Sequence, residues 1–173
     1  MPKSAVTALT LAMAMGMAVP AFAEVVTKSD PQPKCSQRDA LDVKRASFNY
    51  AEQKFAWRIK MASASKKRTR VIGRYTQAAR SDTPYDVMVV TSYDSDGIKR
   101  VVGRWYDADD GSSGRFTDGV TADWDFANEV ITIELTSHLK GERADAWAYS
   151  VAKGAVHGPP CGDYIWSGRI SRG

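Results

Sequence analysis

The sequence has few of the residues that enzymes and metal proteins use for chemistry. Its 173 residues include two histidines, His138 and His157, and two cysteines, Cys35 and Cys161. The Gly-x-Ser-x-Gly, His-Glu-x-x-His and phosphate-loop motifs are absent, and no histidine lies beside a cysteine at zinc-ligand spacing. A serine or cysteine nucleophile needs a base to activate it, and we expect both histidines to be surface loop residues. We therefore expect no catalytic residue, no metal ligand and no cofactor.

An excess of charge of one sign is also lacking. The chain carries 24 Lys and Arg against 20 Asp and Glu, a formal net charge of +4. A dedicated nucleic-acid binder clusters many more basic residues without interleaved acids, so we expect no nucleic-acid partner. The basic run at 66–70 is typical of a solvated turn, and the alternative is a site for a polyanion such as an acidic glycan or a lipid headgroup.

Long hydrophobic runs are limited to one, near the N-terminus. Residues 5–19 form an apolar stretch after Lys3, and the small-x-small step Ala-Phe-Ala follows at 21–23. The stretch is shorter than the about 20 apolar residues of a membrane span, although a signal anchor is the alternative. We expect a cleaved signal peptide at 1–23 and a secreted or periplasmic protein that begins at Glu24. We expect no transmembrane segment in that mature chain.

Secretion into an oxidising compartment would allow the two cysteines to form a disulfide bond. Cys35 and Cys161 lie near the two ends of the mature chain, and an oxidising compartment lets them pair. A disulfide that closes so long a loop stabilises a fold by about 4 to 5 kcal/mol in the chain-entropy model. We expect this disulfide, and the alternatives are two buried thiols or intermolecular bridges.

The hydrophobic periodicity predicts an all-β chain. Residues 55–61 alternate between apolar and polar side chains, which is the period of a strand with one buried face. Asp-Gly at 96–97 lies between two apolar runs and is the strongest hairpin signal in the chain. Strands are expected at 43–50, 55–61, 70–77, 85–93, 98–106, 120–125, 130–135, 147–153 and 164–170.

Strands at this spacing are typical of all-β sandwiches and barrels. We expect a single antiparallel β-sandwich, jelly-roll-like, of about eight or nine strands over residues 41–173, and an up-and-down β-barrel is the alternative. Residues 24–40 are expected to form a flexible leader, because prolines and mixed polar residues give it little to bury. One helical turn is expected at 137–144, where Ser137 could act as the N-cap.

The order of strands and turns in the second half resembles a known group of domains. Residues 120–135 read as a strand, an Asn-containing turn and an alternating strand. Thr-Ser-His-Leu-Lys-Gly at 136–141 and a Trp-bearing strand at 146–153 follow. With Asp-Val-Lys-Arg-Ala-Ser at 42–47 and the acidic turn after Tyr93, this pattern resembles uncharacterised secreted bacterial β-sandwich domains, and distantly carbohydrate-binding and DOMON-type jelly rolls. The resemblance implies a sandwich with a non-catalytic role and assigns no binding residue.

Acidic residues offer two further kinds of chemistry. Asp123, Asp125 and Glu134 could pair across a hairpin as glycosidase carboxylates do, but the outward face of a strand carries the same residues for solubility. The turns at 94–97 and 107–111 present clustered carboxylates of the kind that bind calcium. Aspartate and glycine are also the ordinary residues of hairpin turns, which is the interpretation we favour.

The aromatic residues suggest a binding surface. The chain has five tryptophans, and flat aromatic faces stack on sugar rings, although we expect at least three of the five to fill the core. The strand at 98–106 divides into two faces. The face expected to point inward consists of Val101, Gly103 and Trp105. The outward face, which we expect to bind an acidic sugar through stacking and bidentate hydrogen bonds, consists of Arg100, Arg104 and Tyr106.

These features favour a secreted binding domain that performs no covalent chemistry. The aromatic residues and the resemblance point to an extracellular or cell-wall polysaccharide as its ligand. A protein-interaction module, such as an inhibitor or an adhesive subunit that uses a sheet edge or a loop, is the second interpretation. A secreted hydrolase with carboxylate chemistry is the third.

Overall fold

The chain folds into two antiparallel β-sheets that pack face to face. The structure, a computed structural model, describes residues 24–30, 42–67, 69–78, 84–152 and 162–173. These residues contain no helix that could span a membrane. The strands are β1 (Glu24–Ser29), β2 (Val43–Ala51), β3 (Lys54–Met61), β4 (Thr69–Ala78), β5 (Pro84–Tyr93), β6 (Lys99–Asp107), β7 (Ser113–Phe116), β8 (Val120–Asp125), β9 (Val130–Leu135), β10 (Arg143–Ala152) and β11 (Gly162–Ser171).

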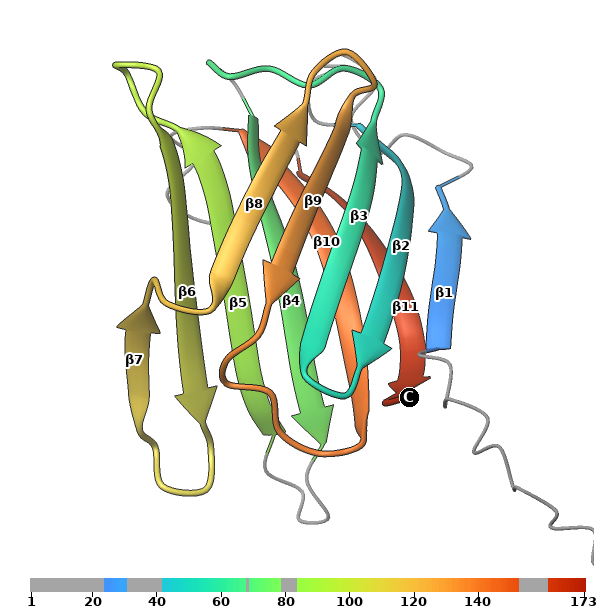
Figure 1. Cartoon of the computed structure of the whole chain (residues 1–173), viewed down its shortest axis with the longest axis vertical. Helices are drawn as coiled ribbons and strands as arrows, with labels where there is room; N and C mark the ends of the chain where they lie inside the picture. Colours follow the sequence, from blue (N-terminus) through green and yellow to red (C-terminus); the bar gives the residue numbers. More distant parts are fainter. Residues whose placement is uncertain (1–23, 31–41, 68, 79–83, 153–161) are drawn as a thin grey trace, which may run out of the picture.

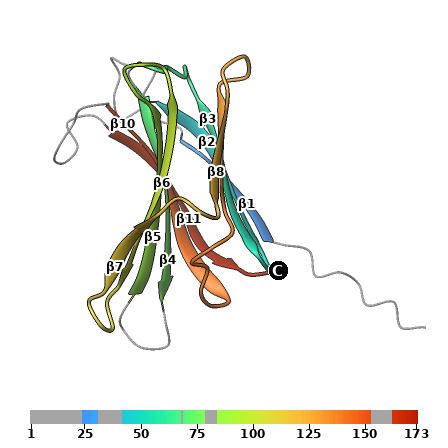
Figure 2. The same ribbon diagram turned by 60° about the vertical axis from the view of Figure 1, so that its left-hand side comes forward.

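The strands form a five-stranded and a six-stranded sheet (Figure 1). The strand order is β1-β2-β3-β9-β8 in the first sheet and β11-β10-β4-β5-β6-β7 in the second. Figure 2 shows the two sheets as separate layers, not joined into one closed barrel. The expected antiparallel sandwich is therefore confirmed, and the barrel alternative is wrong. All nine expected strands are present, as β2 to β6 and β8 to β11.

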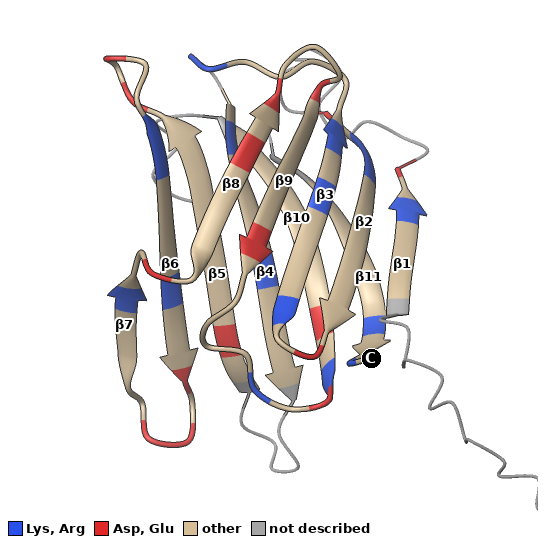
Figure 3. Ribbon diagram, viewed as in Figure 1, with Lys and Arg blue, Asp and Glu red and all other residues tan. Residues whose placement is uncertain are grey.

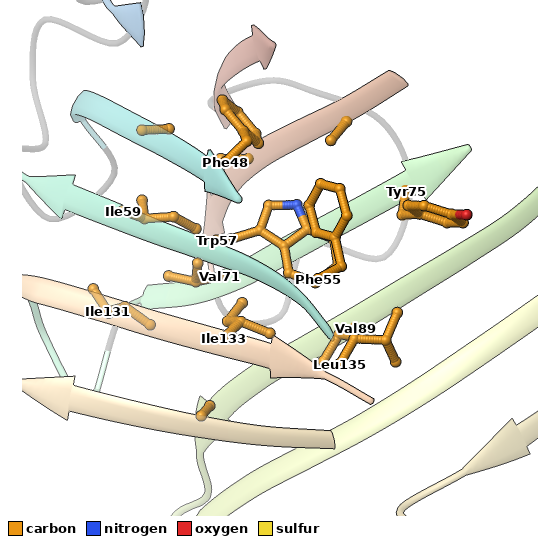
Figure 4. Packing of buried hydrophobic residues seen from close by; sticks show 14 of the residues in the cluster. Phe48, Phe55, Trp57, Ile59, Val71, Tyr75, Val89, Ile131, Ile133 and Leu135 are labelled. Carbon is orange, nitrogen blue, oxygen red and sulfur yellow. The ribbon is translucent and has the colours of Figure 1, made fainter. Parts of the chain in front are cut away.

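The core lies between the sheets and follows from the alternation of each strand. Every second residue of β3 points inward, and the largest of these side chains, Trp57, is fully buried beside Phe55 with ring centroids 4.5 Å apart. Figure 4 shows these rings among Ile133 of β9 and Val71 and Tyr75 of β4. Each large apolar side chain buried here stabilises the sandwich by about 1.5 to 3 kcal/mol.

The leader expected at 24–40 is wrong in its first part. Residues Glu24–Ser29 form strand β1, which pairs with β2 along its whole length. Val26 packs against the core while Val25 is exposed, so one inward apolar residue and the backbone hydrogen bonds of an edge strand are enough to order the segment. Residues 31–40 of the expected leader lie outside the described residues.

The helical turn expected at 137–144 is also wrong. Residues 136–142 form a loop, and β10 begins at Arg143. His138 and Gly141 have φ angles of 56° and 73°, in the left-handed region that a right-handed helix cannot contain. The loop is held from the core side instead, because the Tyr50 hydroxyl donates to the Gly141 carbonyl at 2.6 Å.

Candidate functional site

The outer face of the five-stranded sheet is polar, and several of its charges are paired. Lys54 and Glu134 form an ion pair of 2.8 Å on β3 and β9, and hydroxyl groups of Thr27 and Ser47 lie 2.9 Å apart on β1 and β2. The outward strand positions described on this face carry no aromatic side chain. A surface of this composition is what solubility alone requires.

The outer face of the six-stranded sheet has a different composition. The pairing of neighbouring strands places outward side chains directly opposite one another, so these side chains form rows that run across the strands. The apolar row, from β11 to β6, contains Tyr164, Tyr149, Ile72, Val90 and Val102. On one side of it, the short arginine row contains Arg70, Ser92 and Arg100. On the other side, the long row from β11 to β7 contains Trp166, Trp147, Arg74, Met88, Arg104 and Arg115.

A groove of about 360 Å³ lies over the β4 to β6 part of these rows. Its floor is apolar and is formed by Ile72, Met88, Val90 and Val102. Its rim is polar and basic and is formed by Arg70, Ser92, Arg100, Arg104 and Arg115. Figure 3 shows the basic bands on β4, β6 and β7 that supply this rim. We call this feature the arginine groove.

Strand β6 faces the way that its alternation predicts. Val101 and Trp105 pack against the core, Gly103 is buried, and Arg104 is exposed. Tyr106 is 48% exposed on the same outward face. The orientation of this strand is therefore confirmed, which places all three predicted ligand-binding residues on the outer surface.

The three predicted residues do not share one hollow. Arg100 and Arg104 lie four residues apart on β6, about 13 Å along the strand, and both line the arginine groove. Tyr106 lines a neighbouring hollow, also of about 360 Å³, together with Arg104 and Arg115. Arg104 and Arg115 therefore border both hollows.

The charges of the groove are unevenly balanced. Arg100 is paired with Asp94 at 2.9 Å, and Asp94 also accepts the backbone N–H of Ile98, which is the main reason that its pKa is lowered. Arg70, Arg104 and Arg115 form no ion pair with any residue that the structure describes. The buried Nε of Arg70 also has no hydrogen-bond partner within the described part of the chain.

Two arginines of the groove, Arg70 and Arg115, were missed by sequence reasoning. Arg115 lies on β7, a four-residue strand that was not expected, and Arg70 comes from β4, which the fold inserts between β10 and β5. The signal for Arg70 was the basic run at 66–70, which was interpreted as a solvated turn. In the structure Arg70 is the second residue of β4, which agrees with the strand expected at 70–77.

A larger hollow at the opposite end of the sandwich is a weaker candidate. It has a volume of about 570 Å³, and its lining carries charges of both signs, from Glu52, Glu142, Arg143 and Arg172. No aromatic side chain is among the described residues that line it. Mixed exposed charges indicate solvation more than recognition of one ligand class.

Several of the acidic residues considered for catalysis or calcium have other partners in the structure. Glu134 is paired with Lys54, and Asp125 accepts hydrogen bonds from the backbone and side chain of Asn128 at 3.0 and 2.7 Å. In the 94–97 turn, one Asp94 oxygen accepts the backbone N–H groups of Asp96 and Ile98, as an Asx-turn does. Within the described ranges, no three His, Cys, Asp or Glu side chains form a metal-binding group.

His138 is a loop residue that is only partly exposed. His138 is on a loop as expected, but its ring is half buried, stacked on Trp105 and close to Phe116, with ring centroids 5.9 and 4.2 Å away. Its Nδ1 lies 3.1 Å from the Tyr85 hydroxyl. This packing indicates a structural role. His157 and both cysteines lie outside the described residues.

Comparison with known proteins adds no further constraint on this site. No protein-family model matches the sequence, and no curated protein matches it significantly. The assignment of a function therefore rests on the chemistry of the outer face.

Proposed function

We propose that this protein is a non-catalytic binding domain that acts in the periplasm or outside the cell. Its ligand is an extracellular or cell-wall polysaccharide that carries acidic groups, and the arginine groove is the binding site. The observation that carries the proposal is the set of three arginines, Arg70, Arg104 and Arg115, that border an apolar floor without a carboxylate partner among the described residues.

The chemistry of the groove suits an acidic sugar polymer. A guanidinium group can bind a carboxylate or a sulfate through two parallel hydrogen bonds. The apolar floor can contact the non-polar face of a sugar ring, and Tyr106 beside Arg104 adds an aromatic surface. An open groove on the outer face of a sheet suits an extended polymer, because small molecules bind in more enclosed cavities.

The test is calorimetric titration of the mature chain with polygalacturonate, with neutral dextran and with single-stranded DNA. We expect binding to polygalacturonate that weakens as salt rises, because salt screens exposed charges. Arg104→Ala should weaken this binding at least tenfold, since a hydrogen bond to a charged group contributes about 1.5 to 3 kcal/mol. Tyr106→Ala should weaken it less, and neither variant should lower the melting temperature.

Arg58→Ala is the matched control, because Arg58 is an exposed strand arginine on the outer face of the five-stranded sheet. It should bind like the wild type. Equal losses in Arg58→Ala and Arg104→Ala would show a general charge effect and would contradict the assignment of the groove. Tighter binding to DNA than to polygalacturonate would contradict the ligand class.

A further inference from the structure

Four aromatic side chains lie beside the arginine groove on the same outer face. Trp147 on β10 is directly opposite Trp166 on β11, and Tyr149 is directly opposite Tyr164. The residues that alternate with them on β10 are buried, so these side chains point away from the core. The Tyr149 and Tyr164 ring centroids are 6.0 Å apart. We call this group the aromatic platform.

The platform is exposed to solvent at the edge of the sheet. Trp166 is 54% exposed and Tyr164 is 45% exposed, and both lie on the edge strand β11. Trp166 is more exposed than any other tryptophan described, since Trp57 and Trp124 are buried and Trp105 packs against the core. Contiguous exposed apolar surface of this kind often marks a binding site.

The platform is continuous with the arginine groove. Tyr164 and Tyr149 begin the apolar row, and Ile72, Val90 and Val102 of the groove floor continue it over three more strands. Adjacent strands lie about 4.8 Å apart, so the row measures about 19 Å from β11 to β6. An apolar track therefore connects the aromatic end of the face to its basic end.

The junction between the two parts carries little net charge. The Arg74 guanidinium lies 5.3 Å from the centre of the Trp147 ring. It donates hydrogen bonds to both carboxylate oxygens of Asp86, the shortest of them 2.7 Å. The pKa of Arg74 is raised, mainly by this Asp86 contact. Asp86 thus neutralises Arg74. The unpaired positive charge of the long row lies beyond it, at Arg104 and Arg115.

We infer that the aromatic platform is a second subsite for the polysaccharide, an inference that rests on the proposed function. The polymer lies along the apolar row, across the strands. Its sugar rings stack on the platform, where Trp166 and Tyr164 offer aromatic surface. Its acidic groups bind Arg104 and Arg115 in the groove. The ligand is therefore a linear acidic polysaccharide long enough to reach both subsites.

The test measures binding of polygalacturonate by the full mature chain at several salt concentrations, with Trp166→Ala and Arg104→Ala compared. Trp166→Ala should weaken binding roughly tenfold, the loss that corresponds to about 1.4 kcal/mol, without changing the salt dependence, because stacking involves no net charge. Arg104→Ala should lower both the affinity and the salt dependence. Trp166→Phe, which keeps a flat ring, should retain most of the affinity.

Val25→Ala is the control for loss of an exposed apolar residue on an edge strand, since Val25 is 59% exposed on β1 of the other sheet. It should bind like the wild type. If Trp166→Ala also binds like the wild type while Arg104→Ala is weakened, the second subsite is wrong and the proposed function stands. If the wild type shows no salt-sensitive binding to the polymer, the proposed function itself fails. Trp166-dependent binding to anionic phospholipid vesicles in place of the polymer would overturn the inference in favour of a lipid surface.

Discussion

Arg104 on β6 and Arg115 on β7 are directly opposite each other, and both are exposed on the outer face of the six-stranded sheet. Directly opposite residues of an antiparallel pair have Cβ atoms about 4.5 to 5.5 Å apart, and like charges at that distance destabilise the pair. Neither arginine forms an ion pair with a described residue. The repulsion therefore remains in the unliganded protein, and an acidic ligand would relieve it.

This relationship predicts opposite effects of one substitution on stability and on binding. Arg115→Glu places a carboxylate opposite Arg104, so it should raise the free energy of unfolding by about 0.2 to 1 kcal/mol. The same change should lower the affinity for polygalacturonate by at least tenfold. Urea unfolding and calorimetric titration of the same preparation measure both quantities.

Arg58→Glu is the control for this prediction, because Arg58 lies opposite Thr132 and Ser47 and has no like charge across from it. It should neither stabilise the fold in the same way nor alter binding. A decrease in stability of Arg115→Glu would show that the two arginines do not repel each other in the folded protein.

Gly73 on β4 leaves the space that the Trp57 indole occupies. A Cβ atom at Gly73 would lie 2.7 Å from Cδ2 of Trp57, and that ring is fully buried. Overpacking of a rigid core typically costs about 1 to 3 kcal/mol, and we expect Gly73→Ala to lower the free energy of unfolding by that amount. Urea unfolding measures the loss.

A double-mutant cycle shows whether the contact with the indole is the cause. Trp57→Phe opens space beside residue 73, and it also removes an indole N–H that is buried without a described hydrogen-bond partner. Gly73→Ala should therefore cost less in the Trp57→Phe background than in the wild type. Equal costs in both backgrounds would mean that the alanine acts elsewhere.

Local patterns predicted the strands well where one face is apolar and the turn is short. The 94–97 hairpin and the alternation of β3 are examples, since each depends on residues within the element. The missed strand β7 and the wrongly expected helical turn at 137–144 have local causes as well. β7 has four residues and no apolar alternation, and the loop that carries His138 contains left-handed residues that its side chains did not reveal.

The binding face could be predicted in part. The inward and outward sets of β6 followed from its sequence, and at least three tryptophans do contact the core, as expected, namely Trp57, Trp105 and Trp124. The groove and the platform depend on β4 lying between β10 and β5, and pairings between distant segments leave no local pattern in a single sequence. The sequence alone therefore does not predict that Trp166 and Arg104 lie in the same row of the sheet, which follows from the pairing of the strands between them.

The packing of His138 predicts a pH dependence of stability. Burial, followed by the nearby charge of Lys140, lowers the pKa of His138 below its ordinary value of 6.5. As pH falls through 6.5, His138 becomes protonated in the unfolded chain while it is still neutral in the folded chain. The free energy of unfolding therefore decreases as pH falls through and below that value. Urea unfolding at about pH 7.5 and about pH 5.5 should show the decrease.

Two variants identify the group responsible. His138→Asn removes the titrating ring, and asparagine tolerates the left-handed backbone at this position, so the variant should lose most of this pH dependence. His157→Gln should keep it. Histidine ring signals followed by NMR give the direct measurement, and a normal or raised pKa for His138 would contradict the prediction.

The two cysteines are expected to form a disulfide, and the strands next to them support this expectation. Strand β1 ends and strand β11 begins at the same end of the sandwich (Figure 1). Cys35 follows Ser29 by six residues, which can span up to about 20 Å, and Cys161 directly precedes Gly162.

Cys35→Ser should therefore lower the free energy of unfolding by about 2 to 5 kcal/mol. The double variant with Cys161→Ser should lose no more than the single one, because either change removes the same bond. Alkylation of the native, unreduced protein followed by intact-mass analysis measures the thiols directly, and two alkylated cysteines in the wild type would rule the bond out.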